Sequence, residues 1–266
     1  HHTAEPSLPE AFAVVNPNRL DETSPHRTLA AVGVAFLLVV GLNRALRKAG
    51  WFASRPEPDP LAWLDLVALG TVCDVVPLVG VNRALVAQGL KVLRRRANAG
   101  LAALADVARV QTEPEAYHLG FLLGPRVNAG GRVGRSDLGA RLLALDDASE
   151  AKAIAAELDR FNAERQAIEA QVLEQAMARA GEFADAPVMV IGSEGWHAGV
   201  IGIVASRLKD HFNRPVCVVA VENGIGKGSG RSIAGAALGP AVIAARQAGL
   251  LINGGGHAMA AGFTVE

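Results

Sequence analysis

Near the C-terminal end, three glycines followed by a histidine form the stretch best suited to bind an anion, Gly254–His257. Glycine has no Cβ, so a run of glycines lets backbone N–H groups approach a ligand. An imidazole beside them can donate a hydrogen bond or transfer a proton. The pattern predicts a phosphate or carboxylate cradle made by Gly254, Gly255, Gly256 and His257, and we do not expect packing to require these glycines. The alternative is a loop that merely turns, with His257 buried in the core.

Arginines flank a second glycine-containing segment, Gly124–Arg132. Arg126 and Arg132 lie on either side of a Gly-Gly pair that is typical of a turn, with Asn128 between them. Guanidinium groups bind phosphate through paired hydrogen bonds, so this arrangement predicts a two-point phosphate clamp. The alternative is a solvated loop that carries two surface arginines.

Glycine alternates with other residues between Gly224 and Arg231. In an extended strand, Lys227, Ser229 and Arg231 would project from one face. Two cations and a hydroxyl on that face are suited to follow a phosphodiester backbone. The segment is not a P-loop, because glycine follows the lysine where that motif requires serine or threonine. A solvated edge strand is the alternative.

Two single residues also stand out. Asp74 lies in the apolar run Val72–Leu78, and burying an unpaired carboxylate is costly, so the run predicts a bound cation or a paired partner. A helix cap or a buried salt bridge is the alternative. If the helix that follows His197 begins near Ala198, its N-terminal N–H groups would form an anion site beside the imidazole. For His197 the local pattern favours the alternative, a capping histidine beside an aromatic contact.

The chain begins with two histidines, His1 and His2. Position alone favours a purification-tag remnant. As native sequence, adjacent imidazoles could supply a metal ligand and a phosphate contact.

Composition limits the classes of function. With 266 residues, half of them hydrophobic, the chain is long enough for two domains. Lys plus Arg and Asp plus Glu both count 26, so bulk charge does not favour nucleic acid, although a local basic groove would suffice. Aromatic residues are sparse at 5%, which predicts few base-stacking positions. The two cysteines, Cys73 and Cys217, are far apart, which argues against a disulfide or zinc scaffold and favours a cytoplasmic protein. No apolar run reaches the roughly 20 residues that span a bilayer.

The elements that must position these residues follow from periodicity and turn signals. The first half predicts helices, including a buried one that is apolar nearly all round, and Asn82 as a helix N-cap. The last third alternates strand and helix, which predicts a small α/β domain. The expected helices are 27–49, 61–69, 82–96, 100–107, 114–123, 136–144, 149–180, 200–212 and 236–248, and the expected strands are 13–15, 188–191, 215–221 and 259–265.

Taken in order, these segments resemble the RecJ group of DHH phosphoesterases. The resemblance covers nearly the whole chain, and the joint order of the motifs is far more specific than any one of them. It favours native histidines over a tag at the N-terminal end. The matching pieces are His1-His2, Glu10, Asn16-Pro17, Leu69–Leu78 with Asn82-Arg83, Pro125–Arg132, Trp196–Gly202, Ser229–Ser232, Gly255–His257 and Ala260–Gly262.

That resemblance implies a metal-dependent 5′→3′ exonuclease for single-stranded DNA, with a two-metal site of Mn²⁺ or Mg²⁺, acting in DNA repair and recombination. It implies His1 and Asp74 as metal ligands, with His2 and Asp74 catalytic. It also implies that Arg126 or Arg132 binds a terminal phosphate and that Ser229, Arg231 and His257 hold the nucleotide backbone. Single-stranded DNA is the implied partner, a single-strand-binding protein and a helicase are further candidates, and no membrane is involved. The full set of substrate-binding candidates is Arg126, Asn128, Arg132, His197, Ser229, Arg231, Gly254, Gly255, Gly256 and His257.

The resemblance also sets the expected organisation. Residues 1–148 would be the C-terminal portion of a DHH phosphoesterase domain, 149–181 a long connecting helix and 182–266 a DHH-associated α/β domain, with substrate in the cleft between the domains. The family's remaining acidic metal motifs are absent, so we expect these 266 residues alone to be inactive or nearly so. Two alternatives remain: a phosphodiesterase for short oligonucleotides or cyclic dinucleotides, and a non-catalytic nucleic-acid-binding homologue.

Overall fold

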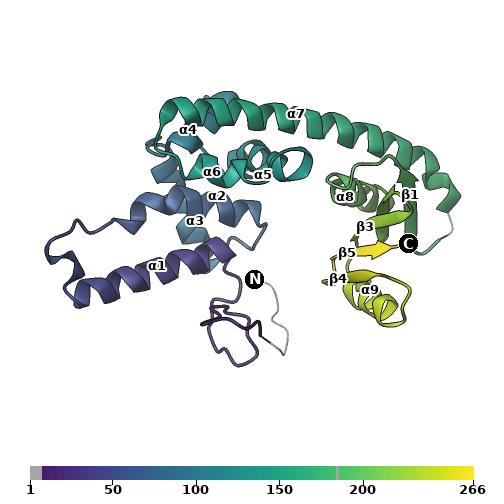
Figure 1. The fold of residues 1–266 in the computed structure, drawn as a ribbon, viewed down its shortest axis with the longest axis horizontal. Coiled ribbons are helices and arrows are strands. Elements are labelled where there is room, and N and C mark those ends of the chain that lie inside the picture. The colour runs from purple at the N-terminus through teal and green to yellow at the C-terminus, as the bar shows by residue number, and fades with distance from the viewer. Residues whose placement is uncertain (1–7, 184–185) are drawn as a thin grey trace. The chain divides into compact units, whose positions relative to one another are not determined.

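The computed structural model describes residues 8–183 and 186–266, and its chain contacts divide into two compact units (Figure 1). The first, here called the helical unit, comprises the residues up to Asn128 together with Asp137–Asp159. The second, the sheet unit, comprises Ala129–Ser136 and Arg160–Glu266. Two helices contribute to both units, because the division cuts through α5 (Gly124–Val133) and α7 (Ala148–Arg179). The mixed α/β class predicted from the sequence is confirmed.

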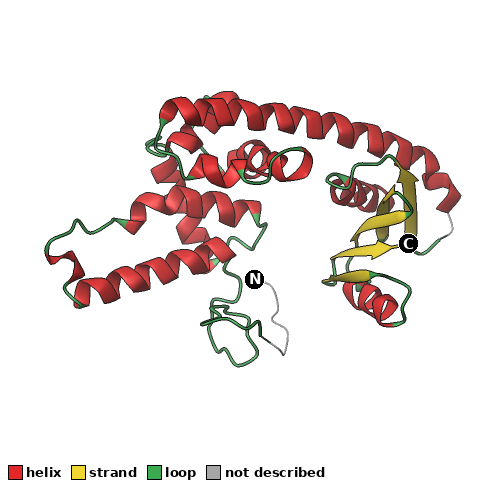
Figure 2. Ribbon diagram, in the orientation of Figure 1, coloured by secondary structure: helices red, strands yellow, loops and turns green. Residues whose placement is uncertain are grey.

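Helices and loops make up the described part of the helical unit (Figure 2). Asp59 caps the short helix η2 (Pro60–Trp63) by accepting the Leu61 N–H at 3.0 Å. Asn98 caps α4 (Ala99–Val107) by accepting the Leu101 N–H at 2.8 Å. Helices α2 (Leu64–Cys73) and α3 (Gly80–Leu93) cross closely because position 89 is glycine: a Cβ there would lie 2.1 Å from the Leu64 carbonyl oxygen. The elements are α1 (Ala31–Lys48), η1 (Trp51–Ala53), η2 (Pro60–Trp63), α2 (Leu64–Cys73), α3 (Gly80–Leu93), α4 (Ala99–Val107), the π-helix η3 (His118–Leu123), α5 (Gly124–Val133) and α6 (Leu138–Leu143).

Several sequence-based expectations for this unit are wrong. Residues 13–15 are loop rather than strand. Asn82 lies inside α3 instead of capping it, and its buried amide donates to the carbonyls of Thr28 and Pro77. Helix α1 is only partly buried, because Leu38 and Leu42 on its outer side are 57% and 55% exposed. None of the described helices combines the length and the hydropathy that crossing a membrane requires.

The long helix α7 (Ala148–Arg179) and a five-stranded sheet dominate the sheet unit. The strand order is β1-β2-β3-β5-β4, with β1 and β2 parallel and the other neighbouring pairs antiparallel. Both cysteines are free thiols, as expected. The remaining elements are η4 (Ala180–Phe183), β1 (Met189–Glu194), α8 (Ile201–Phe212), β2 (Val216–Glu222), β3 (Ile225–Arg231), α9 (Leu238–Gln247), β4 (Asn253–Gly256) and β5 (Ala260–Val265).

The two faces of the sheet are covered by different helices over different strands. On one face α8 packs over β2 and β3, and its buried residues join Val216 and Val218 in the larger core. On the opposite face Leu238 and Val242 of α9 pack against Cys217 and Ala261. The cross-strand row that begins at Val218 continues through Ser229 and Gly262 to Gly255, so the α8 side of the sheet runs out onto β5 and β4. There Gly262 is exposed, and a Cβ at Gly255 would meet nothing within 4 Å.

Candidate phosphate-binding site

Two arginines from distant parts of the sequence converge at the start of α8 in the sheet unit. Arg132, near the end of α5, donates from Nη1 to the Gly199 carbonyl at 3.0 Å. The loop before α8 can approach this closely because position 199 has no side chain. A Cβ there would lie 2.2 Å from the Arg132 carbonyl oxygen. A glycine thus allows the contact that fixes Arg132.

Arg231 comes to the same place from β3. Its Nη1 donates to the Ser229 hydroxyl at 3.1 Å and to the Gly230 carbonyl at 2.8 Å. The first turn of α8 lies against both side chains, because a Cβ at Gly202 would be 2.9 Å from Ser229 Oγ and 3.0 Å from Arg231 Nη2. We call the group Arg132, Gly199, Gly202, Ser229 and Arg231 the arginine site.

The electrostatics of the arginine site favour a bound anion. Burial, and then the positive charge of Arg165, lowers the pKa of Arg132, while Glu169 opposes the shift. Burial, and then the charge of Arg132, lowers the pKa of Arg231. Arg132 is exposed and Arg231 is half-buried, and an anion bound between the two guanidiniums would offset the repulsion that Arg132 exerts on Arg231. The start of α8 adds backbone N–H groups and the positive end of the helix dipole.

Near Arg132 lies a charge network, centred on the buried Glu169, that sequence reasoning missed. Arg165 on α7 donates to Glu169 at 2.5 Å and to the Asn162 amide oxygen at 2.7 Å. Arg207 on α8 donates to the other Glu169 oxygen at 2.7 Å. The Glu169 side chain is only 6% exposed. The network joins α7 to α8 and supplies the positive charge that acts on Arg132.

His197 stabilises the loop before α8. Its Nδ1 accepts the Gly199 N–H at 3.0 Å, and the neighbouring Trp196 is buried, with its indole N–H donating to Gln175 at 2.6 Å. His197 therefore orders the loop and does not cap α8, whose N-cap Val200 receives no side-chain hydrogen bond. Helix α8 begins at Ile201 after the N-cap Val200, which agrees with the predicted range 200–212 and lies later than a start near Ala198.

The triple glycine is an edge strand, not the open cradle that its sequence indicates. Gly254–Gly256 lie in β4 and pair with β5, and His257 is exposed and donates its N–H to the Ala260 carbonyl at 2.7 Å. The expectation that packing does not require these glycines is wrong for two of them. A Cβ at Gly254 would lie 2.8 Å from Val242, and one at Gly256 would lie 2.3 Å from the Ala260 carbonyl oxygen.

The different surroundings of Gly256 and Gly255 predict different losses of stability when each is replaced by alanine. Gly256→Ala should destabilise the sheet unit by about 1–3 kcal/mol, because its Cβ clashes with backbone and its φ of 156° is unfavourable for a side chain. Gly255→Ala should change stability by less than ~1 kcal/mol, because its Cβ enters open space. Urea unfolding of both variants provides the comparison, and similar losses in the two would contradict the strand geometry.

The open side of the sheet presents polar groups and bare backbone. The burial of β3 alternates as expected, with Lys227, Ser229 and Arg231 on one face. Ser229 stands beside the glycines of β5 and β4, and Lys227 pairs with Thr264. At the β4 edge a pocket of about 360 Å³ is lined by Arg246, Asn253, Gly254, Gly255, Gly262, Phe263 and Thr264. This face therefore offers a phosphodiester chain the cations Lys227 and Arg231 and the exposed backbone of the glycines, with few bulky side chains in the way.

In the helical unit, the Arg126 segment is helix α5 and not a turn, so the predicted two-point clamp is wrong in its local structure. Arg126 donates to Asp159 at 2.8 Å and to the Leu122 carbonyl at 2.8 Å. Its side chain is therefore already engaged, whereas Asn128 is exposed. Arg132 lies in the other compact unit.

Asp74 is the C-cap of α2 and is exposed, so the expectation of a buried carboxylate is wrong. Of its apolar neighbours, Val76 is buried but Val75 is 86% exposed. Val75 has a φ of 56°, which is strained for a β-branched residue, and strain of this kind clusters at functional sites. Burial, and then the charge of Asp74, raises the pKa of the Cys73 thiol to about 11, so Cys73 is not a nucleophile at neutral pH.

A metal centre is not assembled by the residues that the structure describes. Within residues 8–183 and 186–266, no three His, Cys, Asp or Glu side chains cluster in a way that could hold a metal ion. Asp74 is a single candidate ligand, and a two-metal centre needs several. His1 and His2, the other candidates, lie outside the described residues.

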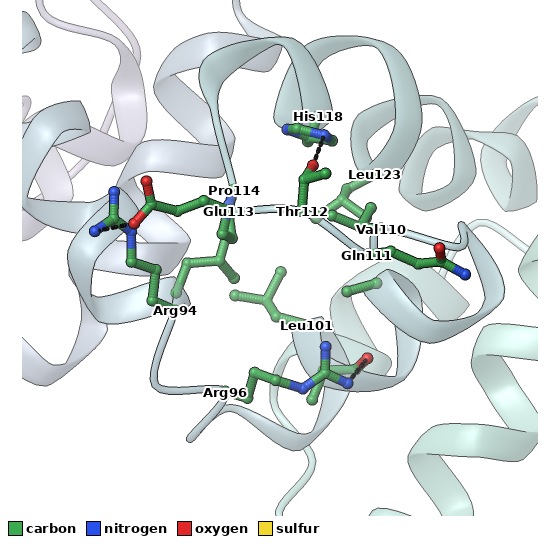
Figure 3. Close-up of a pocket in the computed structure, with 13 residues that line it drawn as sticks. Arg94, Arg96, Leu101, Val110, Gln111, Thr112, Glu113, Pro114, His118 and Leu123 are labelled. Atoms are coloured by element: carbon green, nitrogen blue, oxygen red, sulfur yellow. Dashed lines mark hydrogen bonds and ion pairs between the residues drawn. The ribbon is translucent and has the colours of Figure 1, made fainter.

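A separate pocket of about 300 Å³ lies between α3, α4 and the segment before η3 (Figure 3). Leu101, Val110 and Leu123 give it apolar walls. At its rim Arg94 pairs with Glu113, and Thr112 lies 3.3 Å from His118. Of the predicted site residues that the structure describes, none lines this pocket, so it has no part in the arginine site.

Comparison with known proteins assigns the fold. Residues 151–266 match the DHHA1 domain. The whole chain is 43% identical to the single-stranded-DNA-specific exonuclease RecJ of Dickeya dadantii and 42% identical to that of Escherichia coli, covering 48% of each. It also aligns in full with 38% of a crystal structure of RecJ with Mn²⁺ from Thermus thermophilus, with a TM-score of 0.84 and 38% identity.

A second crystal structure, RecJ with Mg²⁺ from Thermus thermophilus, matches 88% of the chain with a TM-score of 0.76 and 40% identity, over 35% of its own length. The chain thus spans about half the length of the first-named curated relatives. Identity of this level along all 266 residues, together with the matching domain and fold, shows that the chain is similar to RecJ exonucleases over its whole length and carries a DHHA1 domain at residues 151–266.

Proposed function

We propose that the protein is a metal-dependent 5′→3′ exonuclease that removes nucleotides from single-stranded DNA in repair and recombination. The arginine site is the observation that carries the proposal for this chain. Two guanidiniums, a hydroxyl and a helix start converge there without a bulky side chain between them. Relatives named single-stranded-DNA-specific exonuclease support the choice of substrate.

In this proposal Arg132, Ser229 and Arg231 hold a phosphate, and the start of α8 supplies further N–H donors. The DNA strand then passes over the open face of the sheet at β5 and β4, where Gly255 leaves room for the sugar-phosphate chain. His257 and the β4 backbone contribute hydrogen bonds. His197 holds the Gly199 loop, and through it Arg132, in position. Arg126 is proposed to bind substrate phosphate while its ion pair with Asp159 holds its side chain in place. Asn128 is proposed to contact the substrate with its exposed amide.

The hydrolytic step is assigned to divalent cations, with Mn²⁺ or Mg²⁺ proposed because the solved relatives hold these ions. When bound, such ions activate water and neutralise the charge of the phosphodiester. The described residues do not complete such a centre. We propose Asp74 as one ligand, and His1 as another with His2 beside the scissile phosphate. We also propose a cytoplasmic location. A single-strand-binding protein and a helicase are proposed as partners, because both of these proteins act where single-stranded DNA forms.

Binding preference tests the proposed function on the chain as it is. Fluorescence anisotropy should show that a short labelled single strand binds more tightly than the blunt duplex of the same sequence. Affinity should fall as salt rises, because phosphate contacts release counterions. Equal or tighter binding of the duplex would contradict the proposal.

A further inference from the structure

An exposed pair of stacked aromatic rings lies outside the arginine site. The rings of Tyr117 and Phe121 have centroids 5.1 Å apart and planes inclined by 26°. Their exposed fractions are 58% and 70%, which is high for large rings. His118 packs edge-on against the Tyr117 ring at 5.8 Å. The pair is therefore preformed and partly held in place, while much of its surface faces solvent.

The pair stands at the start of the π-helix η3, with Tyr117 as its N-cap residue and Phe121 within it, and the opposite side of η3 is tightly fixed. Leu119 and Leu123 are fully buried, and the Leu119 carbonyl lies 3.7 Å from the Cys73 sulfur. A Cβ at Gly124 would lie 2.4 Å from that same sulfur, so η3 and the end of α2 are in close contact. π-Helical turns are rare and frequently mark functional sites. Core packing explains the leucines but not the outward-facing aromatic rings.

The surroundings of the pair point to nucleic acid. The helix continues without a break from η3 into α5, which carries Arg126 and Asn128. The opposite side of η3 packs on α2, whose C-cap is Asp74. The rings thus share the helical unit with three of the residues proposed to act on substrate. Aromatic faces beside polar groups are how proteins bind unpaired bases, since every base has a π-face and a duplex keeps its faces covered.

We propose that Tyr117 and Phe121 form a stacking site for an unpaired nucleobase of single-stranded DNA. This inference rests on the proposed function and adds a second contact, made to bases and not to phosphates. It supplies a physical source of single-strand preference, because a base within a duplex cannot stack on the pair. Removal of one ring should weaken binding about 5- to 150-fold, the range found for base-aromatic stacking.

The test separates bases from backbone. The affinity of the chain is measured for an oligothymidylate and for an abasic oligonucleotide of equal length and charge. Phe121→Ala and Phe121→Leu should both bind the oligothymidylate about 5- to 150-fold more weakly and leave abasic binding unchanged. Phe121→Tyr should retain most of the affinity. The matched control is Trp51→Ala, which removes another exposed aromatic side chain of the same unit and should affect neither oligonucleotide.

The possible outcomes distinguish a failure of the stacking site from a failure of the proposed function. Equal losses on the two oligonucleotides would overturn stacking, as would Phe121 variants that behave like the Trp51 control while the wild type still prefers single strands. A wild-type chain without that preference would overturn the proposed function and the stacking site together. Phe121→Leu keeps an apolar side chain, so a loss of binding by this variant with an unchanged melting temperature cannot be a folding defect.

Discussion

Replacing Glu169 with leucine is expected to destabilise the sheet unit by about 3–5 kcal/mol. Its carboxylate is buried and accepts from Arg165 and Arg207 through its two oxygens. Without it the Arg165 guanidinium stays buried with only the Asn162 amide oxygen as a side-chain acceptor. A buried charge left without a counter-ion is among the most destabilising changes a point substitution can make.

Urea unfolding followed by circular dichroism measures this loss. The chain offers a matched control in Glu164, which pairs with Arg160 on the same helix with the same four-residue spacing but is 47% exposed. Glu164→Ala should cost about 0.5 kcal/mol or less, because solvent screens exposed pairs. The double substitution of Arg165→Met with Glu169→Leu should recover much of the stability, since it removes both buried charges. Equal losses at Glu164 and Glu169 would show that burial of the network has no energetic consequence.

Replacing Arg231 with alanine should weaken single-stranded DNA binding about 10- to 150-fold, the range for losing a hydrogen bond to a charged group. Its guanidinium is already held by Ser229 and the Gly230 carbonyl, so little ordering is needed when phosphate binds. Arg231→Lys should be intermediate, because lysine keeps the charge but loses the planar fork. The dependence of log Kd on log salt should become shallower by about one in the alanine variant.

Arg44→Ala is the control for this measurement. Arg44 is an exposed arginine on α1, so its removal changes the net charge equally without touching the arginine site. It should weaken binding by less than about twofold, the small effect of one distant surface charge. An Arg44 effect as large as that of Arg231 would mean that the chain responds only to net charge.

How far the sequence could predict the fold depends on how local each signal is. The long helix was expected at 149–180 and is found at Ala148–Arg179, because its amphipathic pattern has no glycine or proline to interrupt it. The strands β1, β2 and β5 were also anticipated from their apolar and β-branched runs. Strand β4 was missed, since three glycines carry no side-chain alternation, and its pairing is set by β5.

The candidate site was less predictable because its geometry is tertiary. The sequence pattern of the helix 149–180 does not distinguish Arg165 from an exposed arginine, and only the packing of α8 reveals that it is buried beside Glu169. The Gly-Gly pair before Arg132 resembled a turn, yet it lies in α5. The apolar neighbours of Asp74 predict a buried carboxylate, but Asp74 is the exposed C-cap of α2. The alternation on β3 was predictable because a strand fixes it locally.

The most direct measurement of whether Arg231 binds a DNA phosphate uses a neutral backbone. Wild type and Arg231→Ala are compared on a short single strand and on the same strand with methylphosphonate linkages, which remove the phosphate charge and leave the bases intact. We predict that the substitution weakens binding of the charged strand at least tenfold and has almost no effect with the neutral strand. Equal losses on the two strands would contradict a phosphate contact at Arg231.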